Sequence, residues 1–390
     1  MNHGNIDAVI SRESFDIDAM LADLGDMVRA ESPSRDTARL ETHSVVVSDI
    51  MERRLGSRPA VVSSINGPHL HWRGGGEPKV LILGHHDTVH PVGTHDRIPF
   101  EVRDGIAVGP GVFDMKAGIV QAIHAVAAMG DASHVEILLS SDEEIGSGAS
   151  RALIEERARA AGAVLVLEPA AQGGDLKIGR KGTGTFTVRV EGRASHAGLE
   201  PEKGINALME LAVLLPRIAA IANPAAGTTV TPTLASAGSA DNVVPAVATC
   251  AVDVRVADPA EKARVEAEMA GLSPSLDGAR VIVEGGIGRP PMHESASAEL
   301  FSLAVRVADA HGLAMPRGVV VGGGSDGNFT AAIGVQTLDG LGAVGGGAHA
   351  DDEHVVVSTM PERAALLAAM CQELSSMARR PPLGNVPADL

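Results

Sequence analysis

Metal-binding side chains follow four short apolar segments of this chain. Each segment leads, at once or through a short loop, to His85, Glu144, Glu168 or His349. In open α/β sheets, ligands bind beyond the carboxyl ends of the strands. We therefore predict that imidazoles and carboxylates meet at one edge of a sheet, where they would support metal-dependent hydrolysis. The four segments are Val80–Leu83, Val135–Leu139, Val164–Leu167 and Val335–Leu338.

Zinc is the metal that fits these side chains. It binds histidine nitrogens and carboxylate oxygens when thiolates are absent, and Cys250 and Cys371, the only cysteines, lack the spacing of a thiolate site or a disulfide framework. Two zinc ions about 3.5–4 Å apart can hold a water and polarise a carbonyl group. Such a pair needs roughly five protein ligands, one of them bridging. Asp114, which follows a Gly/Pro loop and precedes an Ala-rich segment, supplies the fifth.

Glu143 and Glu144 are adjacent carboxylates just beyond one of the apolar segments. Burying two carboxylates costs free energy unless a positive charge lies beside them. We expect a metal ion to bind one of them and the other to act as a general base on the metal-bound water. A solvated acidic turn is the alternative explanation for this pair.

Single residues of the set also have ordinary structural explanations. Asp114 could be a helix N-cap, His85 a core histidine satisfied by main-chain atoms, and Glu168 a surface residue at a strand end. The prediction of a metal site therefore depends on the combination of all five residues.

The elements that would position these side chains alternate between helix and strand. This alternation predicts an α/β fold in which helices cover a parallel or mixed sheet. The same alternation resumes at Ser297 and continues to a last helix at 361–378. Expected helices before residue 182 are 16–30, 39–55, 116–129 and 147–161, with short strands at 60–65 and 70–72.

A second domain is expected after about residue 181, where the pattern changes. Residues 185–190 alternate with the period of two that is typical of a strand with one exposed face. The order βαββαβ then indicates a small ferredoxin-like domain inserted into the larger one. We assign residues 183–291 to this insert, and 1–182 with 292–390 to the catalytic domain. Within the insert, the helices are expected at 206–222 and 259–270, and the other strands at 228–237, 247–256 and 280–284.

Composition excludes several classes of protein. The 390 residues carry a net charge of −17, which argues against nonspecific nucleic-acid binding. Residues 1–14 are polar, unlike a secretory signal, and no run of about 18 apolar residues could span a membrane. We therefore expect a cytoplasmic protein that binds neither nucleic acid nor membrane.

Five motifs resemble those of the dinuclear zinc aminoacylase/carboxypeptidase family, which includes glutamate carboxypeptidase, acetylornithine deacetylase and succinyl-diaminopimelate desuccinylase. The resemblance spans nearly the whole chain, and the motifs are specific in their combination and order. Glu168 followed by Pro169 is most similar to the glutamate carboxypeptidase branch. The motifs are Gly84–Val89, Gly109–Gly118, Asp142–Ser147, Glu168–Pro169 and Gly347–His349.

The resemblance implies a catalytic domain of the zinc-exopeptidase fold with two zinc ions per subunit. His85 would bind one ion and His349 the other, with Asp114 as the bridge. Glu144 and Glu168 would complete the two coordination spheres. Cobalt or manganese could substitute, because both accept nitrogen and oxygen ligands.

The resemblance also implies catalytic roles. Glu143 would be the general base, and Asp87 would orient the imidazole of His85. In the inserted domain, which would act as a lid and join two subunits into a homodimer, His196 would stabilise the oxyanion. Asn242 would line the same cleft. Considered alone, His196 could equally be a loop histidine without a role.

Substrate-binding residues are implied by the same comparison. Arg255 and Arg289 match family positions near a substrate carboxylate, which an arginine fork binds with two hydrogen bonds. Gly323 and Gly324 precede a predicted helix and would offer main-chain N–H groups to that carboxylate. When the alignment is shifted by one residue after Glu168, Lys177 matches a family lysine that recognises a glutamate side chain. A solvated strand face is the alternative for Arg255.

The expected function is a zinc-dependent exopeptidase or amidohydrolase. It would cleave an amide next to a free carboxylate, with a C-terminal glutamate-like residue as the leaving group. The alternative is an N-acyl amino acid deacylase such as an acetylornithine-type deacetylase. A remote alternative is an inactive scaffold that binds peptides.

Overall fold

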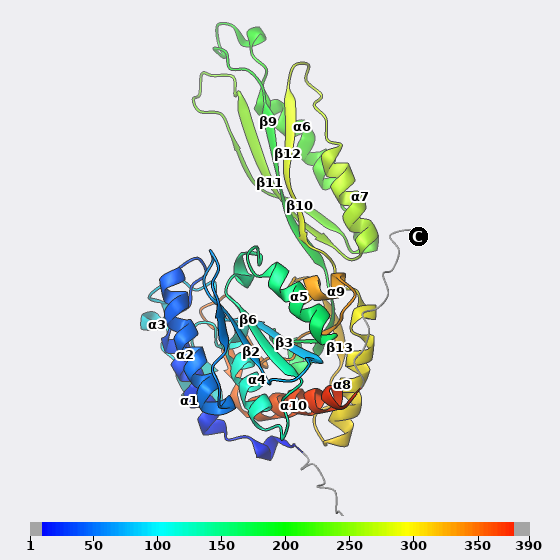
Figure 1. The fold of residues 1–390 in the computed structure, drawn as a ribbon. Helices are drawn as coiled ribbons and strands as arrows, with labels where there is room; N and C mark the ends of the chain where they lie inside the picture. Colours follow the sequence, from blue (N-terminus) through cyan, green and yellow to red (C-terminus); the bar gives the residue numbers. More distant parts are fainter. Residues whose placement is uncertain (1–9, 378–390) are drawn as a thin grey trace, which may run out of the picture. The chain divides into compact units, whose positions relative to one another are not determined.

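The computed structural model describes residues 10–377, which fold into two compact units (Figure 1). Unit 1 is Met1–Gly179, Glu294–Val320 and Ser325–Leu390, and unit 2 is Arg180–His293 and Val321–Gly324. Residues 1–9 of the polar N-terminal segment and residue 378 of the expected last helix lie outside the described range. No helix within residues 10–377 is long and apolar enough to cross a membrane.

Unit 1 contains a six-stranded mixed sheet with the strand order β1-β2-β6-β3-β7-β14. Strands β6, β3, β7 and β14 are parallel to one another, whereas β1 and β2 are antiparallel to their neighbours. The four apolar segments of the sequence are therefore adjacent parallel strands. The bounds are β1 Ala60–Val62, β2 His69–Arg73, β3 Val80–His85, β6 Val135–Ser140, β7 Ala163–Val166 and β14 Gln336–Leu338.

Helices cover this sheet, as the sequence predicted, and the structure shows that they cover both faces. Alternate residues of β3 point to opposite faces, so Val80 and Ile82 join one apolar core while Leu81 and Leu83 join another. Burial on both faces explains why these strands are continuous apolar runs. The first core packs against α1 Ile17–Arg29, α2 Thr37–Leu55, α4 Ala117–Ala127, α8 Ala298–Ala310 and α10 Met360–Ser376, and the second against α5 Arg151–Ala161, with α9 Gly327–Ala332 beside α5 (Figure 1).

A second, four-stranded sheet of short strands also belongs to unit 1, with the order β15-β16-β5-β4. It joins the segment after β14 to the segment that precedes Asp114, because β16 pairs with β5. The sequence did not reveal it, since two or three residues are too few to show a period. The bounds are β4 Glu101–Arg103, β5 Ile106–Val108, β15 Gly345–Gly346 and β16 His354–Val356. The sequence also did not predict a short helix, α3 Thr94–Arg97, or a separate two-stranded sheet of β8 Leu176–Arg180 and β13 Gly318–Val321.

Unit 2 has the predicted βαββαβ order and a four-stranded antiparallel sheet with the order β10-β11-β9-β12. This is the ferredoxin-like arrangement. Every second residue of β11 is buried against the helices in a core of the unit's own. The elements are β9 Gly182–Glu191, α6 Ala207–Ala219, β10 Thr229–Ala237, β11 Val247–Val256, α7 Pro259–Ala270 and β12 Arg280–Arg289.

Several element boundaries differ from the prediction, among them the end of the strand expected at 60–65, which is Val62, and two of the differences have a clear local reason. Strand β12 continues to Arg289 rather than ending at Glu284, because a register shift after Gly286 lets pairing with β9 resume. Helix α5 begins at Arg151 rather than at Ser147, whose φ of 59° is not helical.

Candidate metal centre

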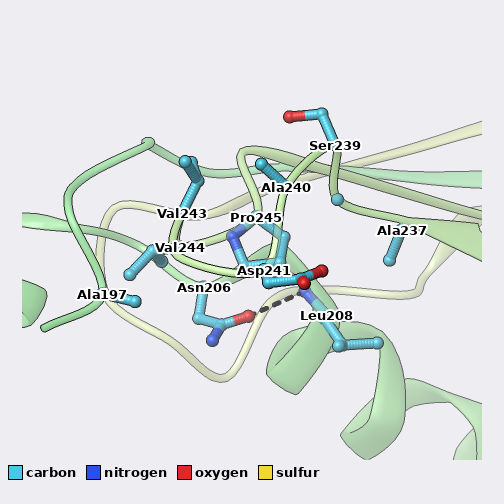
Figure 2. Close-up of a pocket in the computed structure, with 11 residues that line it drawn as sticks. Ala197, Asn206, Leu208, Ala237, Ser239, Ala240, Asp241, Val243, Val244 and Pro245 are labelled. Atoms are coloured by element: carbon cyan, nitrogen blue, oxygen red, sulfur yellow. Dashed lines mark hydrogen bonds between the residues drawn. The ribbon is translucent and has the colours of Figure 1, made fainter.

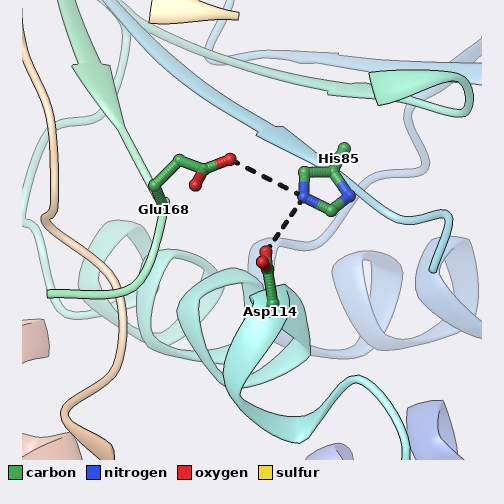
Figure 3. Close-up of side chains that lie close together, drawn as sticks. All are labelled: His85, Asp114 and Glu168. Carbon is green, nitrogen blue, oxygen red and sulfur yellow. Dashed lines mark hydrogen bonds and ion pairs between the residues drawn. The ribbon is translucent and has the colours of Figure 1, made fainter. Parts of the chain in front are cut away.

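Five side chains of unit 1 form two groups that share one carboxylate. The first group is His85, Asp114 and Glu168, and the second is Asp114, Glu144 and His349. Within each group, one ligand atom of every residue lies within 4.8 Å of the others. Figure 3 shows the first group, with the carboxylates of Asp114 and Glu168 directed at the ring of His85.

The two oxygens of Asp114 face two different imidazoles. Its Oδ1 lies 3.2 Å from Nε2 of His85, and its Oδ2 lies 3.3 Å from Nε2 of His349. Each imidazole also faces a second carboxylate: Glu168 Oε1 is 3.7 Å from His85 Nε2, and Glu144 Oε1 is 3.3 Å from His349 Nε2. This is the arrangement of a bridging carboxylate between two half-sites.

The donor atoms fit a pair of divalent metal ions. Ligand atoms about 2.0–2.2 Å from a tetrahedral zinc lie about 3.4 Å from one another, close to the separations measured here. The donors are imidazole nitrogens and carboxylate oxygens, a set that suits zinc, cobalt or manganese. Oε1 of Glu144 is buried, and the ring of His349 is the positive group that faces it, at 3.3 Å.

The electrostatics of the cluster favour positive charge. Hydrogen bonds from the His349 ring to Asp114 and Glu144 raise the pKa of His349 to about 10. Burial opposes ionisation of His85, but Asp114 and Asp87 raise its pKa well above the usual value. In the absence of metal, protons on these imidazoles balance the carboxylates. A divalent cation would replace those protons, since metal ligands must be deprotonated.

Parallel strands position three of the five donors. His85 is the last residue of β3, Glu168 follows β7 by two residues, and Glu144 lies in the single turn Glu143–Ile145 after β6. Their strands are neighbours in one sheet, so their carboxyl ends bring these side chains to one edge. The expectation of a shared edge agrees with this geometry.

Asp114 is held by an irregular segment rather than by a helix. Its dihedral angles are not helical, its peptide bond to Met115 is cis, and the N-cap of α4 is Lys116. The alternative that Asp114 caps the helix is therefore wrong. Gly111 allows the segment to turn, because its φ is 72° and a Cβ there would lie 2.6 Å from Cγ2 of Thr88.

His349 lies in the loop between β15 and β16 with a φ of 64°, a left-handed conformation that costs a non-glycine residue about 1–3 kcal/mol. Its side chain is half exposed. Pairing of β15 with β16 and of β16 with β5 anchors this loop beside the segment that leads to Asp114. The small sheet therefore brings the second half-site together.

Asp87 contacts the cluster differently from the expectation. The Nδ1 atom of His85 meets the main-chain oxygen of Asp87 at 2.9 Å, and the carboxylate lies farther away, at 3.5 Å. The carboxylate instead accepts hydrogen bonds from the main-chain N–H groups of Glu143 and Glu144 and from the hydroxyl of Ser34. Asp87 thus holds both the imidazole of His85 and the turn that carries Glu143.

His196 of unit 2 is exposed, and its ring has a defined tautomer. Its Nδ1 accepts hydrogen bonds from the N–H groups of Gly198 and Leu199, both at 3.1 Å. A neutral His196 therefore carries its proton on Nε2, where it can be donated to an anion. The N–H of Ala197 donates to the main-chain oxygen of Asn242, and His196 pairs with Val243, so the two predicted residues lie on paired loops.

These paired loops border an open hollow of about 580 Å³ in unit 2 (Figure 2). One side is formed by the N-terminus of α6, where the side chain of Asn206 accepts a hydrogen bond from the N–H of Leu208 at 3.1 Å. Ala197 and Val243 line the hollow beside the two predicted residues. The hollow lies entirely within unit 2.

The predicted substrate-binding residues divide into separate groups. In unit 2, Arg289 is buried and packs so closely on Gly324 that a Cβ there would lie 3.2 Å from Arg289 Cδ. Arg255 instead forms a two-pronged ion pair with Asp253 on its own strand. Lys177 belongs to β8 in unit 1, where its main chain pairs with that of Asp339.

The sequence did not single out several residues that organise the site. Arg180 donates to the carbonyl oxygens of Gly323 and Gly324, which fixes the glycine loop in unit 2. In unit 1, Asp326 accepts hydrogen bonds from the hydroxyls of Ser140 and Ser147, on either side of the Glu143–Glu144 turn. Glu353 accepts the N–H of Asp114. The only available signal was the position of Glu353, four residues after His349.

Comparison with protein families and curated sequences gives consistent matches. A model described as peptidase family M20/M25/M40 matches residues 81–373. Carboxypeptidase G2 of Pseudomonas sp. (strain RS-16) is 34% identical over 317 residues, which cover 78% of this chain and 76% of that protein. Succinyl-diaminopimelate desuccinylase of Xanthomonas oryzae pv. oryzae (strain MAFF 311018) is 31% identical over 335 residues, covering 77% and 85%.

Solved structures share the fold at lower identity. Aminopeptidase PepT from Bacillus cereus ATCC 10987 has a TM-score of 0.74 and 20% identity, covering 93% of this chain and all of that one. The M20 family metallo-carboxypeptidase Sso-CP2 from Sulfolobus solfataricus has a TM-score of 0.71 and 16% identity, covering 92% and 99%.

Proposed function

Because the chain belongs to peptidase family M20/M25/M40, a family of metal-dependent hydrolases, we propose that it is a two-zinc exopeptidase that releases a C-terminal, glutamate-like residue. The observation that carries this proposal is the position of Asp114, whose two oxygens face His85 and His349 separately. A site of this form is suited to hydrolysis of an amide. An inactive scaffold would have no need for it.

The proposed mechanism assigns each step to a residue of the chain. Bound metal ions would supply the Lewis acidity that polarises the amide carbonyl. Glu143 takes a proton from the attacking water, whose oxygen forms a bond to the carbonyl carbon. Glu143 then transfers this proton to the leaving nitrogen, so the C–N bond breaks and the nitrogen departs as a neutral amine. Nε2 of His196 donates a hydrogen bond to the oxyanion. Asp87 keeps the Glu143 turn in place through its hydrogen bonds to the main chain.

Preference for a substrate with a free carboxylate is supported by unit 2. Arg180 and Arg289 are both buried, and both lie against the loop Gly322–Gly324. A guanidinium binds a carboxylate through two parallel hydrogen bonds. We assign Arg289, Gly323 and Gly324 to the substrate carboxylate. Arg255 is the weaker candidate, because Asp253 already occupies its guanidinium.

Release of a C-terminal residue is supported by the 34% identity to carboxypeptidase G2, and glutamate as that residue by the Glu168–Pro169 pair. The second candidate, deacylation of an N-acyl amino acid, is supported by the 31% identity to a desuccinylase. Both reactions would use the same metal ligands and Glu143. In both, the released amino acid carries the α-carboxylate, so the two candidates differ in the side chain of that amino acid and in the acyl group.

We also propose a homodimer formed through unit 2. Strand β10 is an edge of its sheet, and Leu234 on that strand is 74% exposed. Helix α6, which packs beside β10, exposes three further apolar side chains on its surface, Leu208, Met209 and Val213. An exposed edge strand with apolar neighbours is a ready template for pairing with a second copy.

A substrate screen tests the proposed function. Protein loaded with zinc is offered acyl-glutamates, dipeptides with C-terminal glutamate, N-acetylornithine and N-succinyl-diaminopimelate, and released amine is measured. The proposal expects the highest kcat/KM on substrates that release glutamate. Faster release from N-acetylornithine or N-succinyl-diaminopimelate would favour the deacylase, and no turnover of any amide by zinc-loaded protein would refute both.

A further inference from the structure

We propose that Glu353 is the positioning residue of the bridging carboxylate: it holds the main chain at Asp114 so that the two carboxylate oxygens face the two half-sites. This inference depends on the two-metal site proposed above. Glu353 would not bind metal itself. It would act by fixing the one ligand that both metal ions share.

The contacts of Glu353 converge on the segment that carries Asp114. Its Oε1 accepts the N–H groups of Phe113 and Asp114, both at 2.9 Å. Its Oε2 accepts the N–H of Gly111, also at 2.9 Å. A single carboxylate thus binds three N–H groups within four residues, although Glu353 lies 239 residues from Asp114 in the sequence.

This segment needs such a partner because no regular element holds it. Asp114 and Met115 are not helical, so the N–H groups around the bridging residue cannot all be satisfied by a helix. Buried N–H groups without an acceptor cost free energy. Glu353 supplies acceptors for three of them and, in doing so, sets the direction in which the Asp114 side chain leaves the main chain.

Glu353 also joins the other two ligand segments of the site. Its Oε2 lies 2.6 Å from Nε2 of His90, which is five residues after His85. Glu353 itself is four residues after His349 and directly precedes β16. One carboxylate therefore connects the segments that carry a ligand of the first half-site, a ligand of the second, and the bridge.

Burial makes this carboxylate a fixed anchor rather than a surface contact. Glu353 is 2% exposed, and His90 is 8% exposed. Lys116, which is fully buried, places a further positive charge near Glu353. A buried carboxylate with this many partners has little freedom to move, which is what an outer partner of a metal ligand requires.

Glu353→Gln tests the inference. Glutamine can accept two N–H groups through its oxygen but directs its own NH₂ at the third, so the segment must shift. Outer partners of metal ligands typically contribute about 10–100-fold to metal affinity. We expect Glu353→Gln to lower zinc affinity by at least about tenfold, measured on metal-free protein by competition with a chelator, and to change the visible absorption spectrum of the cobalt-loaded protein.

Glu210→Gln is the matched control. Glu210 is fully buried in unit 2 and accepts the N–H groups of Ser275 and Leu276 at 2.8 and 2.7 Å. It therefore has the same kind of role in a loop that carries no predicted metal ligand. We expect Glu210→Gln to alter thermal stability while leaving zinc affinity and the cobalt spectrum unchanged.

The outcomes separate this inference from the proposed function. If Glu353→Gln binds two zinc ions with the affinity of the unmodified protein and an unchanged cobalt spectrum, the inference is overturned. If the unmodified protein itself binds fewer than two ions, the proposed two-metal site fails instead. Should Glu353→Gln not fold, Glu353→Asp, which keeps the charge but shortens the reach, decides: unmodified affinity in that variant would also overturn the inference.

Discussion

Asp114 carries the chemistry of the candidate site because each of its oxygens has a different imidazole as neighbour. Its environment keeps it ionised: burial alone would raise its pKa, but His349 and His85 hold it well below the usual range. A carboxylate that stays charged and contacts two imidazoles can bridge two cations. The neighbouring Glu143 and Glu144, by contrast, are proposed to have separate roles.

Substituting Glu143 separates the general base from the metal ligands. We expect Glu143→Gln to lower kcat by about 10²–10⁴-fold while two metal ions remain bound, because an amide cannot take the proton from water. Glu144→Gln is the contrasting variant, since it removes a proposed ligand and should lower metal content. Steady-state kinetics and metal analysis of both variants check this. Near-normal turnover by metal-loaded Glu143→Gln would contradict the role.

Metal affinity should depend on pH in a defined direction. The pKa of His349 is about 10 in the metal-free protein, so at neutral pH an ion that binds there must displace a proton. The apparent affinity then falls about tenfold for each unit by which pH is lowered, per proton displaced. We expect about 100-fold weaker binding at His349 at pH 6 than at pH 8, measured by chelator competition. A constant affinity across this range would exclude proton displacement at His349.

Residue type and position were enough to predict the five candidate ligands, since each follows a strand or a Gly/Pro loop. The role of Glu353, by contrast, could not be predicted from the sequence, for a physical reason. Its importance comes from contacts with main-chain N–H groups at Gly111, Phe113 and Asp114, and main-chain groups are the same at every position of a sequence. Only the folded backbone shows which of them lack a partner.

At the scale of elements, the strands of unit 1 with the clearest sequence signal are the ones buried on both faces. Strands β3, β6 and β7 are fully buried and, apart from Glu136 and the residues at the ends of β3 and β6, they are apolar. The small sheet of β4, β5, β15 and β16 has no such signature, because its strands are short and partly exposed. The element that brings His349 to Asp114 was consequently missed, although both residues were predicted.

Asp23 ties three helices of unit 1 together, and its charge should make stability depend on pH. It lies on α1, is 1% exposed, and contacts Arg53 and Arg54 of α2 and His124 of α4 at 2.6–2.8 Å. Burial opposes its ionisation, but these partners lower the pKa of Asp23 well below the usual value. Its contribution is therefore present above about pH 4, the unfolded pKa, and is lost as pH falls toward the folded value.

We expect Asp23→Asn to lower the free energy of unfolding by about 2 kcal/mol at pH 7, less than for a fully buried pair because the arginines are partly hydrated. The difference from the unmodified protein should shrink between pH 5 and pH 3. Urea unfolding at several pH values measures it. Asp49→Asn, which removes an exposed partner of Arg58, is the control and should have little effect. An Asp23→Asn deficit that is independent of pH would contradict the role of charge.

At the scale of the whole molecule, the chain forms two units with separate apolar cores. The change of pattern near residue 181 indicated this division, because the period of two in unit 2 differs from the continuous apolar strands of unit 1. The sequence could not indicate that residues Val321–Gly324 join unit 2. These four residues are separated from the rest of that unit by nearly thirty residues of sequence, and a segment of four residues is too short to show a hydrophobic period.

Leu234→Lys tests the proposed homodimer. A lysine on edge strand β10 would place a charge where apolar contact with a second copy is proposed, so we expect weaker self-association with little change in stability. Sedimentation equilibrium over a range of concentrations measures it. Ile65→Lys, at an 87% exposed position of unit 1, is the matched control. An unmodified protein that remains monomeric at all concentrations would refute the dimer.

The insertion of unit 2 into unit 1 has a consequence for the order of events during synthesis. His85, Asp114, Glu144 and Glu168 leave the ribosome before residues 180–293, whereas β14, His349 and Glu353 leave it afterwards. Domains generally fold as units while the chain is still emerging, so unit 2 can complete its sheet while unit 1 still lacks a strand. The nascent chain would therefore carry four of the proposed ligands without Glu353, and the proposed second half-site could form only after His349 has emerged.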